Sequence, residues 1–338
     1  MIVDDSATMR RLIRAILETE PRLSVVAEAG TAREARDAVN RYRPDVMTLD
    51  VEMPNMSGLE FLQRLMRHRP MPVVMVSTLT QRGSDIAIEA MALGAVDCVE
   101  KPRAGGGADE FAKLAQTIVL AAGARVGARR PVRPETVPRD DRQFRRICLI
   151  GGSTGAVDAI ERTLRAFPAN CPPTLITQHM PEPFLVSFAA RLDPLVRPRV
   201  RIAGDGDLLR AGEVLIAPGG PFHLNVDTGG PLRTRLLAAP PVSGHRPSVD
   251  AMFLSAGAIA PKVVAGILTG MGRDGAEGMR LLRQAGARTV GQSKESCVVF
   301  GMPRVAGELG GVERWADIEE FGEAMLDLAT TPARAKTR

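Results

Sequence analysis

The stretch ICLIGGSTGAVDAIERTL, residues 147–164, joins a strand pattern to a helical pattern through a glycine-rich turn. Residues 147–150 are a short apolar run, and Val157, Ile160 and Leu164 then recur at helical spacing. A buried strand that leads directly into a helix opens a βα unit, and such units build parallel sheets covered by helices. We therefore predict an α/β domain in this half of the chain.

The same alternation extends in both directions from this stretch. Downstream, strand patterns at 174–177, 263–268 and 289–292 alternate with helical patterns such as 184–192 and 278–284, and the region 200–237 is rich in β residues with Gly and Pro turns. Upstream, strand patterns stand at 2–3, 24–28, 45–49, 72–76 and 95–99, with helical patterns between them and with Ser6 and Thr31 as candidate helix caps. The chain is therefore predicted to be α/β, with two doubly wound parallel-sheet domains and a β-hairpin insertion in the second.

Length and composition agree with two soluble domains. At about 150 residues per domain, 338 residues suggest two domains. The hydrophobic share of 45% and charged share of 25% exclude a wholly disordered chain. The sequence has no apolar run of about 18 residues and no signal-peptide pattern at its start, so we expect no membrane insertion and a cytoplasmic location.

The net charge of +5 is unevenly distributed. Residues 1–103 and 147–330 each carry a net charge of −1, whereas residues 104–146 carry +4 and the last eight residues carry +3. Aromatic residues make up only 4%, which leaves few stacking platforms for single-stranded nucleic acid. Because both domains are nearly neutral, we expect no nucleic-acid partner.

Charged and polar residues follow the strands of the predicted first sheet. Asp4 and Asp5 end the first strand and Asp50 ends the third, so the three carboxylates meet at one edge and repel each other unless a cation is present. Such oxygen-rich clusters suit Mg²⁺. Ser77 and Lys101 end the fourth and fifth strands, where a phosphoryl group on Asp50 would need a hydroxyl and an ammonium. Any one of these acids alone could equally be a helix cap or a solvated strand end.

The first 103 residues resemble two-component receiver domains. The matching motifs are Asp4-Asp5-Ser6, Leu49-Asp50-x-x-Met53-Pro54-x-x-x-Gly58, Val76-Ser77 and Lys101-Pro102. The resemblance implies a flavodoxin-like fold, phosphorylation of Asp50 by a sensor histidine kinase, and contacts of Ser77 and Lys101 with the phosphoryl oxygens. It also implies Mg²⁺ bound by Asp5, Asp50 and the backbone carbonyl of Glu52, with Asp4 assisting.

Two positions depart from the receiver pattern. Cys98 stands where receivers often carry an aromatic switch residue, so we do not expect an aromatic rotamer switch. Only three residues precede Asp4, which leaves the first strand very short, and we expect the true start to lie upstream.

The turn 151–155 reads Gly-Gly-Ser-Thr-Gly and matches Gly-x-Ser-x-Gly, in which glycines permit a sharp turn that exposes the serine. Ser153 would need a base, because a serine hydroxyl is a weak nucleophile near neutral pH. His179 follows the strand 174–177 and Asp274 follows the strand 263–268, so both are expected at the same sheet edge. Taken singly, the glycine-rich turn more often binds a phosphate or nucleotide, and His179 and Asp274 could be structural.

Residues from about 147 to 325 resemble the catalytic domain of the chemotaxis protein-glutamate methylesterases, the CheB family. The matching stretches are Ile150-Gly151-Gly152-Ser153-Thr154-Gly155, Gln178-His179-Met180-Pro181, Ala217-Pro218-Gly219-Gly220, Pro247-Ser248-Val249-Asp250 and residues 268–275. The resemblance implies a Rossmann-like fold and a catalytic triad of Ser153, His179 and Asp274 that needs no cofactor. It further implies the backbone N–H of Met271 as oxyanion donor and Thr154 beside the nucleophile. His223 and His245 are interpreted as cleft-side or structural.

The resulting organisation is a receiver domain at 1–122, a flexible basic linker at 123–146, a methylesterase domain at 147–330 and a basic tail at 331–338. The expected function is a phosphorylation-regulated hydrolase that demethylates glutamate methyl esters and deamidates glutamines on the cytoplasmic helices of chemoreceptors. The alternative is a response regulator whose second domain binds a nucleotide or a partner without hydrolysis, in which case His179 and Asp274 are spectators.

Overall fold

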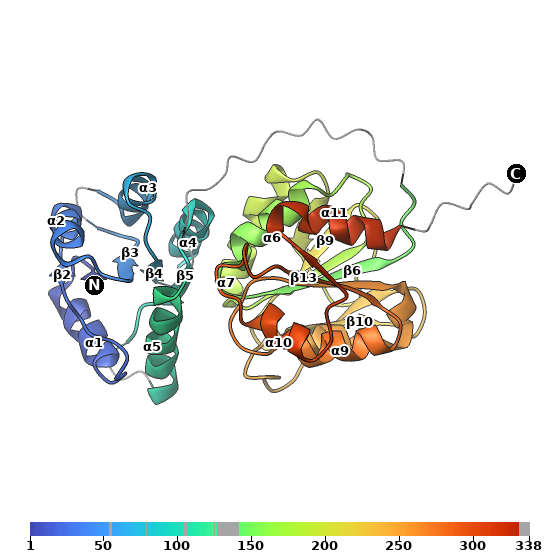
Figure 1. Ribbon diagram of the computed structural model, residues 1–338. Coiled ribbons are helices and arrows are strands. Elements are labelled where there is room, and N and C mark those ends of the chain that lie inside the picture. Colours follow the sequence, from blue (N-terminus) through green and yellow to red (C-terminus); the bar gives the residue numbers. More distant parts are fainter. Residues whose placement is uncertain (54–55, 79, 104–106, 125, 127–141, 331–338) are drawn as a thin grey trace, which may run out of the picture. The chain divides into compact units, whose positions relative to one another are not determined.

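The structure is a computed structural model that describes the chain except residues 54–55, 79, 104–106, 125, 127–141 and 331–338 (Figure 1). The described chain divides into two compact units, one from Met1 to Val132 and one from Arg133 onward. Most of the predicted linker and the whole predicted tail lie outside the described residues. No helix in the described part of the chain combines the length and apolar character that a membrane span requires.

The first unit contains a five-stranded parallel sheet in the order β2-β1-β3-β4-β5. Its strands are β1 (Ile2–Val3), β2 (Glu28–Ala29), β3 (Met47–Asp50), β4 (Val73–Ser77) and β5 (Asp97–Glu100). The order of the strands reverses between β1 and β3, and ligands of such sheets bind at the carboxyl ends of the strands at this point. Asp4 directly follows β1, and Asp50 is the last residue of β3.

The helices of the first unit are α1 (Ala7–Leu17), α2 (Ala32–Tyr42), α3 (Gly58–His68), α4 (Gln81–Leu93) and α5 (Ala108–Ala122). The predicted caps are confirmed, since the side chains of Ser6 and Thr31 accept hydrogen bonds from the backbone N–H groups of Met9 and Glu34. The strand predicted at 24–28 is wrong in extent. β2 pairs only with the two residues of β1, so its ladder is confined to Glu28 and Ala29.

The second unit contains a seven-stranded parallel sheet in the order β14-β13-β12-β6-β7-β9-β8. Its strands are β6 (Ile147–Gly152), β7 (Thr174–Gln178), β8 (Arg199–Ile202), β9 (Glu213–Ile216), β12 (Val263–Ile267), β13 (Arg288–Gln292) and β14 (Arg314–Ala316). The chain enters the sheet at β6, builds outward through β7, and later crosses to β12 on the other side of β6. The switch point therefore lies between β6 and β12.

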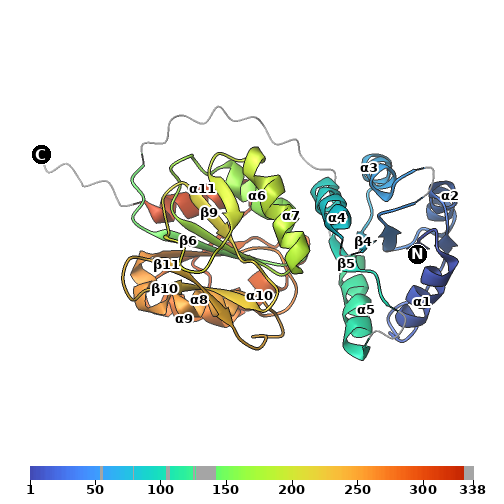
Figure 2. The same cartoon turned by 180° about the vertical axis from the view of Figure 1, so that it is seen from behind.

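Helices cover both faces of this sheet, as Figures 1 and 2 show. One face carries α6 (Ala156–Arg165) and α11 (Ile318–Ala329), and the other carries α8 (Val249–Ser255), α9 (Ala276–Gln284) and α10 (Met302–Glu308). Helix α7 (Glu182–Leu192) follows β7. The hairpin β10 (Phe222–Asp227) and β11 (Arg233–Ala238) is antiparallel and packs against α8.

The predicted fold class is confirmed in both units, with one correction to the second. The β-rich region 200–237 is not a single hairpin insertion, because β8 and β9 pair parallel to β7 and extend the main sheet. Only β10 and β11 form the hairpin.

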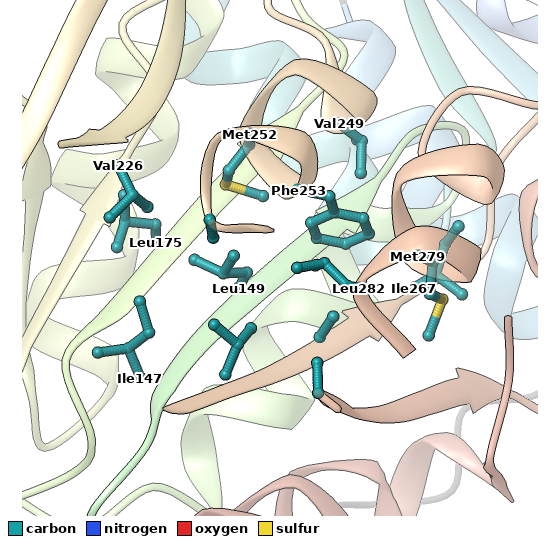
Figure 3. Packing of buried hydrophobic residues seen from close by; sticks show 14 of the residues in the cluster. Ile147, Leu149, Leu175, Val226, Val249, Met252, Phe253, Ile267, Met279 and Leu282 are labelled. Carbon is teal, nitrogen blue, oxygen red and sulfur yellow. The ribbon is translucent and has the colours of Figure 1, made fainter. Parts of the chain in front are cut away.

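A buried cluster lies between the sheet and the helices α8 and α9 (Figure 3). Met252 and Phe253 from α8 meet Met279 and Leu282 from α9 above Leu149 of β6. The fit to the sheet is tight at the end of β6, where a Cβ on Gly151 would lie only 2.2 Å from Cγ1 of Val249. The core thus fixes the start of α8 directly beside the glycine-rich turn 151–155.

We predict that Phe253→Ala lowers the free energy of unfolding of the second unit by about 3–5 kcal/mol, because it removes a fully buried ring and leaves a cavity. Chemical denaturation of the full chain, followed by circular dichroism, measures the effect. Leu254→Ala is the matched control, since that neighbouring side chain is 45% exposed, and it should change stability by much less. If the two variants lost the same amount of unfolding free energy, the packing described would be contradicted.

Candidate active site

The turn after β6 holds Ser153 at the carboxyl edge of the sheet. Gly155 has a φ of +78°, which favours glycine, and a Cβ there would lie 2.5 Å from Val298. The backbone N–H of Ser153 donates to the carbonyl of Thr269 over 3.1 Å, and its carbonyl accepts from Nε2 of Gln178 over 2.8 Å. Ser153 is therefore fixed from both neighbouring strand ends.

His179 lies next to Ser153 because the strands that carry them are paired. Gly152 of β6 is in register with Gln178 of β7, and the N–H of His179 donates to the carbonyl of Gly152 over 3.2 Å. Paired strands lie about 4.8 Å apart, so the residues that follow this pair stand side by side. The structure thus brings together two residues that are 26 positions apart in the sequence.

The His179 ring uses its two nitrogens differently. Nε2 lies 2.7 Å from Oδ2 of Asp274, while the buried Nδ1 has no hydrogen-bond partner within the described part of the chain. With Asp274 ionised, Nε2 carries the proton and donates it to the carboxylate. Nδ1 is then the unprotonated nitrogen that can accept a proton.

Asp274 is 1% exposed and collects donors from the start of α8. Oδ1 accepts from Ser248 Oγ (2.7 Å) and from the N–H of Asp250 (3.0 Å), and Oδ2 accepts from the N–H of Val249 (2.7 Å) as well as from His179. Burial by itself would raise the pKa of the Asp274 carboxyl, but the bond to His179 and the other donors outweigh it and lower that pKa. A carboxylate held in this way stays charged beside the imidazole.

Asp250 is a second buried carboxyl in the same helix turn. Burial raises its pKa, and the nearby charge of Asp274 acts in the same direction, although its bond to the N–H of Gly278 opposes the rise. The pKa of Asp250 is therefore raised while that of Asp274 is lowered. Asp274, the carboxyl that faces His179, is the one held ionised.

The remaining predicted residues surround Ser153. Gly270 passes so close that a Cβ there would lie 2.7 Å from Cβ of Ser153, and the N–H of the next residue, Met271, makes no hydrogen bond within the described part of the chain. Thr154 is buried, and its carbonyl accepts from Oγ1 of Thr269 over 3.1 Å. A free N–H on the residue after Gly270 suits an oxyanion donor.

The two other histidines of this unit occupy different environments. His223 is buried, accepts from the N–H of Ser248 through Nδ1 over 3.1 Å and has Nε2 3.0 Å from the carbonyl of Pro240, as a structural bridge would. The ring of His245 is stacked on that of His179, with centroids 3.8 Å apart and an interplanar angle of 8°.

Sequence reasoning did not assign the roles of Gln178 and Ser248, which orient Ser153 and Asp274. Both residues stand in motifs quoted above, Gln178 directly before His179 and Ser248 directly before Val249, and their place in those motifs was the available signal.

The first unit brings three carboxylates together as predicted. Ligand oxygens of Asp4, Asp5 and Asp50 lie within 4.8 Å of one another, and Asp4 and Asp50 are each 1% exposed. Lys101 Nζ lies 2.7 Å from Oδ2 of Asp50 and 3.3 Å from Oδ2 of Asp4. Burial raises the pKa of Asp50 to about 6, with Asp4 adding to the rise and Lys101 opposing it.

This cluster fits a divalent cation. One ammonium is shared between two buried carboxylates, and among the described residues Oδ2 of Asp4 has an ion pair with Lys101 but no well-aligned hydrogen-bond donor. Three carboxylates around one position form an oxygen donor set of the kind that Mg²⁺ prefers.

Ser77 and Glu52 lie beside this cluster. Oγ of Ser77 lies 3.2 Å from the carbonyl of Gly83 in α4 and 3.3 Å from its neighbour's carbonyl, that of Thr78, so in this structure its hydroxyl hydrogen is directed to backbone rather than to Asp50. The N–H of Glu52 donates to Oδ1 of Asp50 over 3.2 Å, which holds the loop after β3 against the carboxylate.

Comparison with known families gives two matches. A family described as CheB methylesterase matches residues 148–325, and one described as response regulator receiver domain matches residues 1–106. The solved catalytic domain of Thermotoga maritima CheB methylesterase is 35% identical, with a TM-score of 0.52, and the alignment covers 54% of this chain and 98% of that one.

Curated relatives match over nearly the whole length. A protein-glutamate methylesterase/protein-glutamine glutaminase 1 of Caulobacter vibrioides is 51% identical over 335 residues, which cover 98% of this chain and 97% of the relative. A protein of Agrobacterium fabrum named protein-glutamate methylesterase/protein-glutamine glutaminase is also 51% identical, over 338 residues that cover 98% of this chain and 96% of the relative.

We predict that Asp274→Asn destabilises the second unit at neutral pH by about 2–4 kcal/mol, because an amide NH₂ would face buried donors. The folded pKa of Asp274 lies below the unfolded value of about 3.9, so its stabilising contribution is present above that pH and is lost as the pH falls further. The difference in the free energy of unfolding between Asp274→Asn and the wild type should therefore become smaller below about pH 4. Urea denaturation at several pH values measures it.

Glu295→Gln is the control for this prediction, since it makes the same chemical change at an exposed loop position and should have little effect. If the loss of unfolding free energy in Asp274→Asn were the same at every pH, the assignment of an ionised carboxylate would be contradicted.

Proposed function

This chain belongs to the CheB methylesterase family, and on that premise we propose that it removes methyl groups from glutamate methyl esters on the cytoplasmic helices of chemoreceptors. The same site would deamidate receptor glutamines, since an amide passes through a similar tetrahedral intermediate. Within the structure, the observation that carries the proposal is the 2.7 Å contact between Nε2 of His179 and Oδ2 of Asp274, at the end of the strand that pairs with the strand before Ser153. The protein would act in the cytoplasm, where these receptor helices lie.

The reaction begins with the Ser153 hydroxyl. Oγ attacks the ester carbonyl while Nδ1 of His179 takes the hydroxyl proton, and the negative charge that develops on the carbonyl oxygen is met by the N–H of Met271. Asp274 keeps the proton on Nε2 and stabilises the imidazolium.

The tetrahedral intermediate then collapses. His179 returns the proton to the leaving atom, which is the methoxy oxygen of an ester or the nitrogen of an amide. Methanol or ammonia then departs, and the glutamyl group remains on Oγ. Water, deprotonated by the same nitrogen, attacks this acyl-enzyme, and the proton passes back to Ser153 as the free glutamate leaves. No cofactor is required for any of these steps.

A non-hydrolytic second domain is not favoured. A glycine-rich turn that binds a phosphate has no use for a buried imidazole–carboxylate pair beside its serine, and the Asp274 carboxylate is held ionised there. The curated relatives are also named as enzymes.

We expect Ser153→Ala to reduce methanol release from a methylated receptor fragment by at least about a thousandfold, since removing a triad nucleophile commonly costs that much or more. Gas chromatography measures methanol, and mass spectrometry of the fragment reports demethylation and deamidation. Ser296→Ala, a serine change in a nearby loop, is the control and should retain activity. Undiminished release by Ser153→Ala would refute the proposal.

The receiver domain is proposed to regulate this activity through Asp50, phosphorylated by a sensor histidine kinase. Asp5, Asp50 and the carbonyl of Glu52 would hold Mg²⁺, with Asp4 assisting, and the ion would neutralise the oxygens around the acceptor. Lys101, already 2.7 Å from Asp50, would then contact a phosphoryl oxygen, with Ser77 turned toward it. Phosphorylation would release the esterase from restraint by the receiver.

We predict that Asp50→Asn abolishes both phosphorylation by a small phosphodonor and the accompanying rise in esterase rate, while basal esterase activity remains. Addition of a chelator to the wild type should have the same result, because the carboxylates would lose their cation. Intact-protein mass spectrometry and methanol release measure the two effects, with the exposed Asp37→Asn as control. If the phosphodonor raised the esterase rate of Asp50→Asn as it does that of the wild type, the assignment of Asp50 as the phosphorylated residue would be contradicted.

A further inference from the structure

Residues 242–245 form a tight hairpin beside the candidate active site. The N–H of Val242 donates to the carbonyl of His245, and the N–H of His245 donates back to the carbonyl of Val242, each over 3.0 Å. The two central residues, Ser243 and Gly244, have φ values of +51° and +79°, as the two-residue type I′ turn requires. A turn of this kind leaves its flanking residues little freedom.

The hairpin presents His245 to the candidate base. The rings of His245 and His179 are nearly parallel, with an angle of 8°, and their centroids are 3.8 Å apart. At this separation the two rings are in van der Waals contact across their faces. The bond to Asp274 fixes one atom of the His179 ring, and the stack restricts the plane in which the ring lies.

The ring plane matters because Nδ1 is the free nitrogen. Nδ1 is bonded to the ring carbon that joins the side chain, so rotation about the Cβ–Cγ bond carries it toward or away from Ser153. A displacement of about 1 Å in a reacting group can cost a hundredfold in rate.

The hairpin is attached to the same helix turn that holds Asp274. Oγ of Ser243 donates to Oδ2 of Asp250 over 3.1 Å, Oδ1 of Asp250 accepts from the N–H of Gly278 over 2.8 Å, and the N–H of Asp250 donates to Asp274. On the other side, Nε of Arg246 donates to the carbonyl of Gly220 over 2.9 Å. His245 and Asp274 are therefore anchored to one rigid element.

We propose that the 242–245 hairpin sets the plane of the His179 ring, with His245 as a positioning residue and Ser243 as the attachment that holds the hairpin to Asp250. The proposal rests on the function proposed above. In this role His245 supplies an aromatic face and transfers no proton.

The test compares His245→Ala with His245→Phe in the full chain, using methanol release from the methylated receptor fragment. His245→Ala should lower kcat by about tenfold to a hundredfold with KM nearly unchanged, because the substrate still binds but the base is misaligned. His245→Phe keeps a stacking ring and should stay within about threefold of wild type. His68→Ala, at an exposed position of the first unit, is the matched control and should behave as wild type.

Three results would overturn the proposal. Equal losses in His245→Phe and His245→Ala would show that His245 acts through its nitrogens, unchanged kcat in His245→Ala would show that it has no role, and a change confined to KM would make it a substrate contact. If His245→Ala does not fold, Ser243→Ala decides, since the proposal requires a lower kcat at unchanged KM. Activity of the wild type and its loss in Ser153→Ala test the proposed function separately.

Discussion

The carboxylate of Asp274 is the group on which the proposed catalytic arrangement depends. It lies at the N-terminal turn of α8, where two backbone N–H groups and the hydroxyl of Ser248 donate hydrogen bonds to it. The imidazole of His179 supplies a further hydrogen bond, to Oδ2. Those donors compensate the cost of burying the charge, and they also fix the carboxylate in space. The packing of Phe253 and its neighbours is what holds α8 in this position.

The candidate sites of both units lie at the same structural location. In the first, the strand order reverses between β1 and β3, where Asp4 follows β1 and Asp50 ends β3. In the second, Ser153 follows β6 and the loop with Asp274 follows β12, across the corresponding reversal. In each unit a buried carboxylate stands beside a group that can carry positive charge, Lys101 in one and His179 in the other. The fold brings these groups together, and local hydrogen bonds decide which of them remain charged.

Much of this arrangement could be predicted from the sequence because parallel strands bring their carboxyl ends to one edge. That rule alone placed Ser153, His179 and Asp274 together, although the last two are 95 residues apart. It could not show which ring nitrogen faces Asp274, since that depends on the side-chain rotamer of His179 and on the position of α8. Nor could it show the stack of His245, which results from a four-residue turn that carries no strand or helix periodicity.

Other differences from the sequence-based predictions have similar causes. The pairing of β8 and β9 with the main sheet depends on contacts with β7 across distant segments, so short apolar runs did not distinguish it from a hairpin. The hydrogen bonds of Ser77 to backbone at the start of α4 are a rotamer choice that no residue pattern specifies.

The central claim is that His179, oriented by Asp274, makes Ser153 a nucleophile, and an active-site-directed phosphonate ester tests it most directly. Peptide mapping by mass spectrometry after reaction should locate the label on Ser153, and His179→Ala should react far more slowly at that residue. Labelling that leaves Ser153 unmodified, or that proceeds at the same rate without His179, would contradict the account.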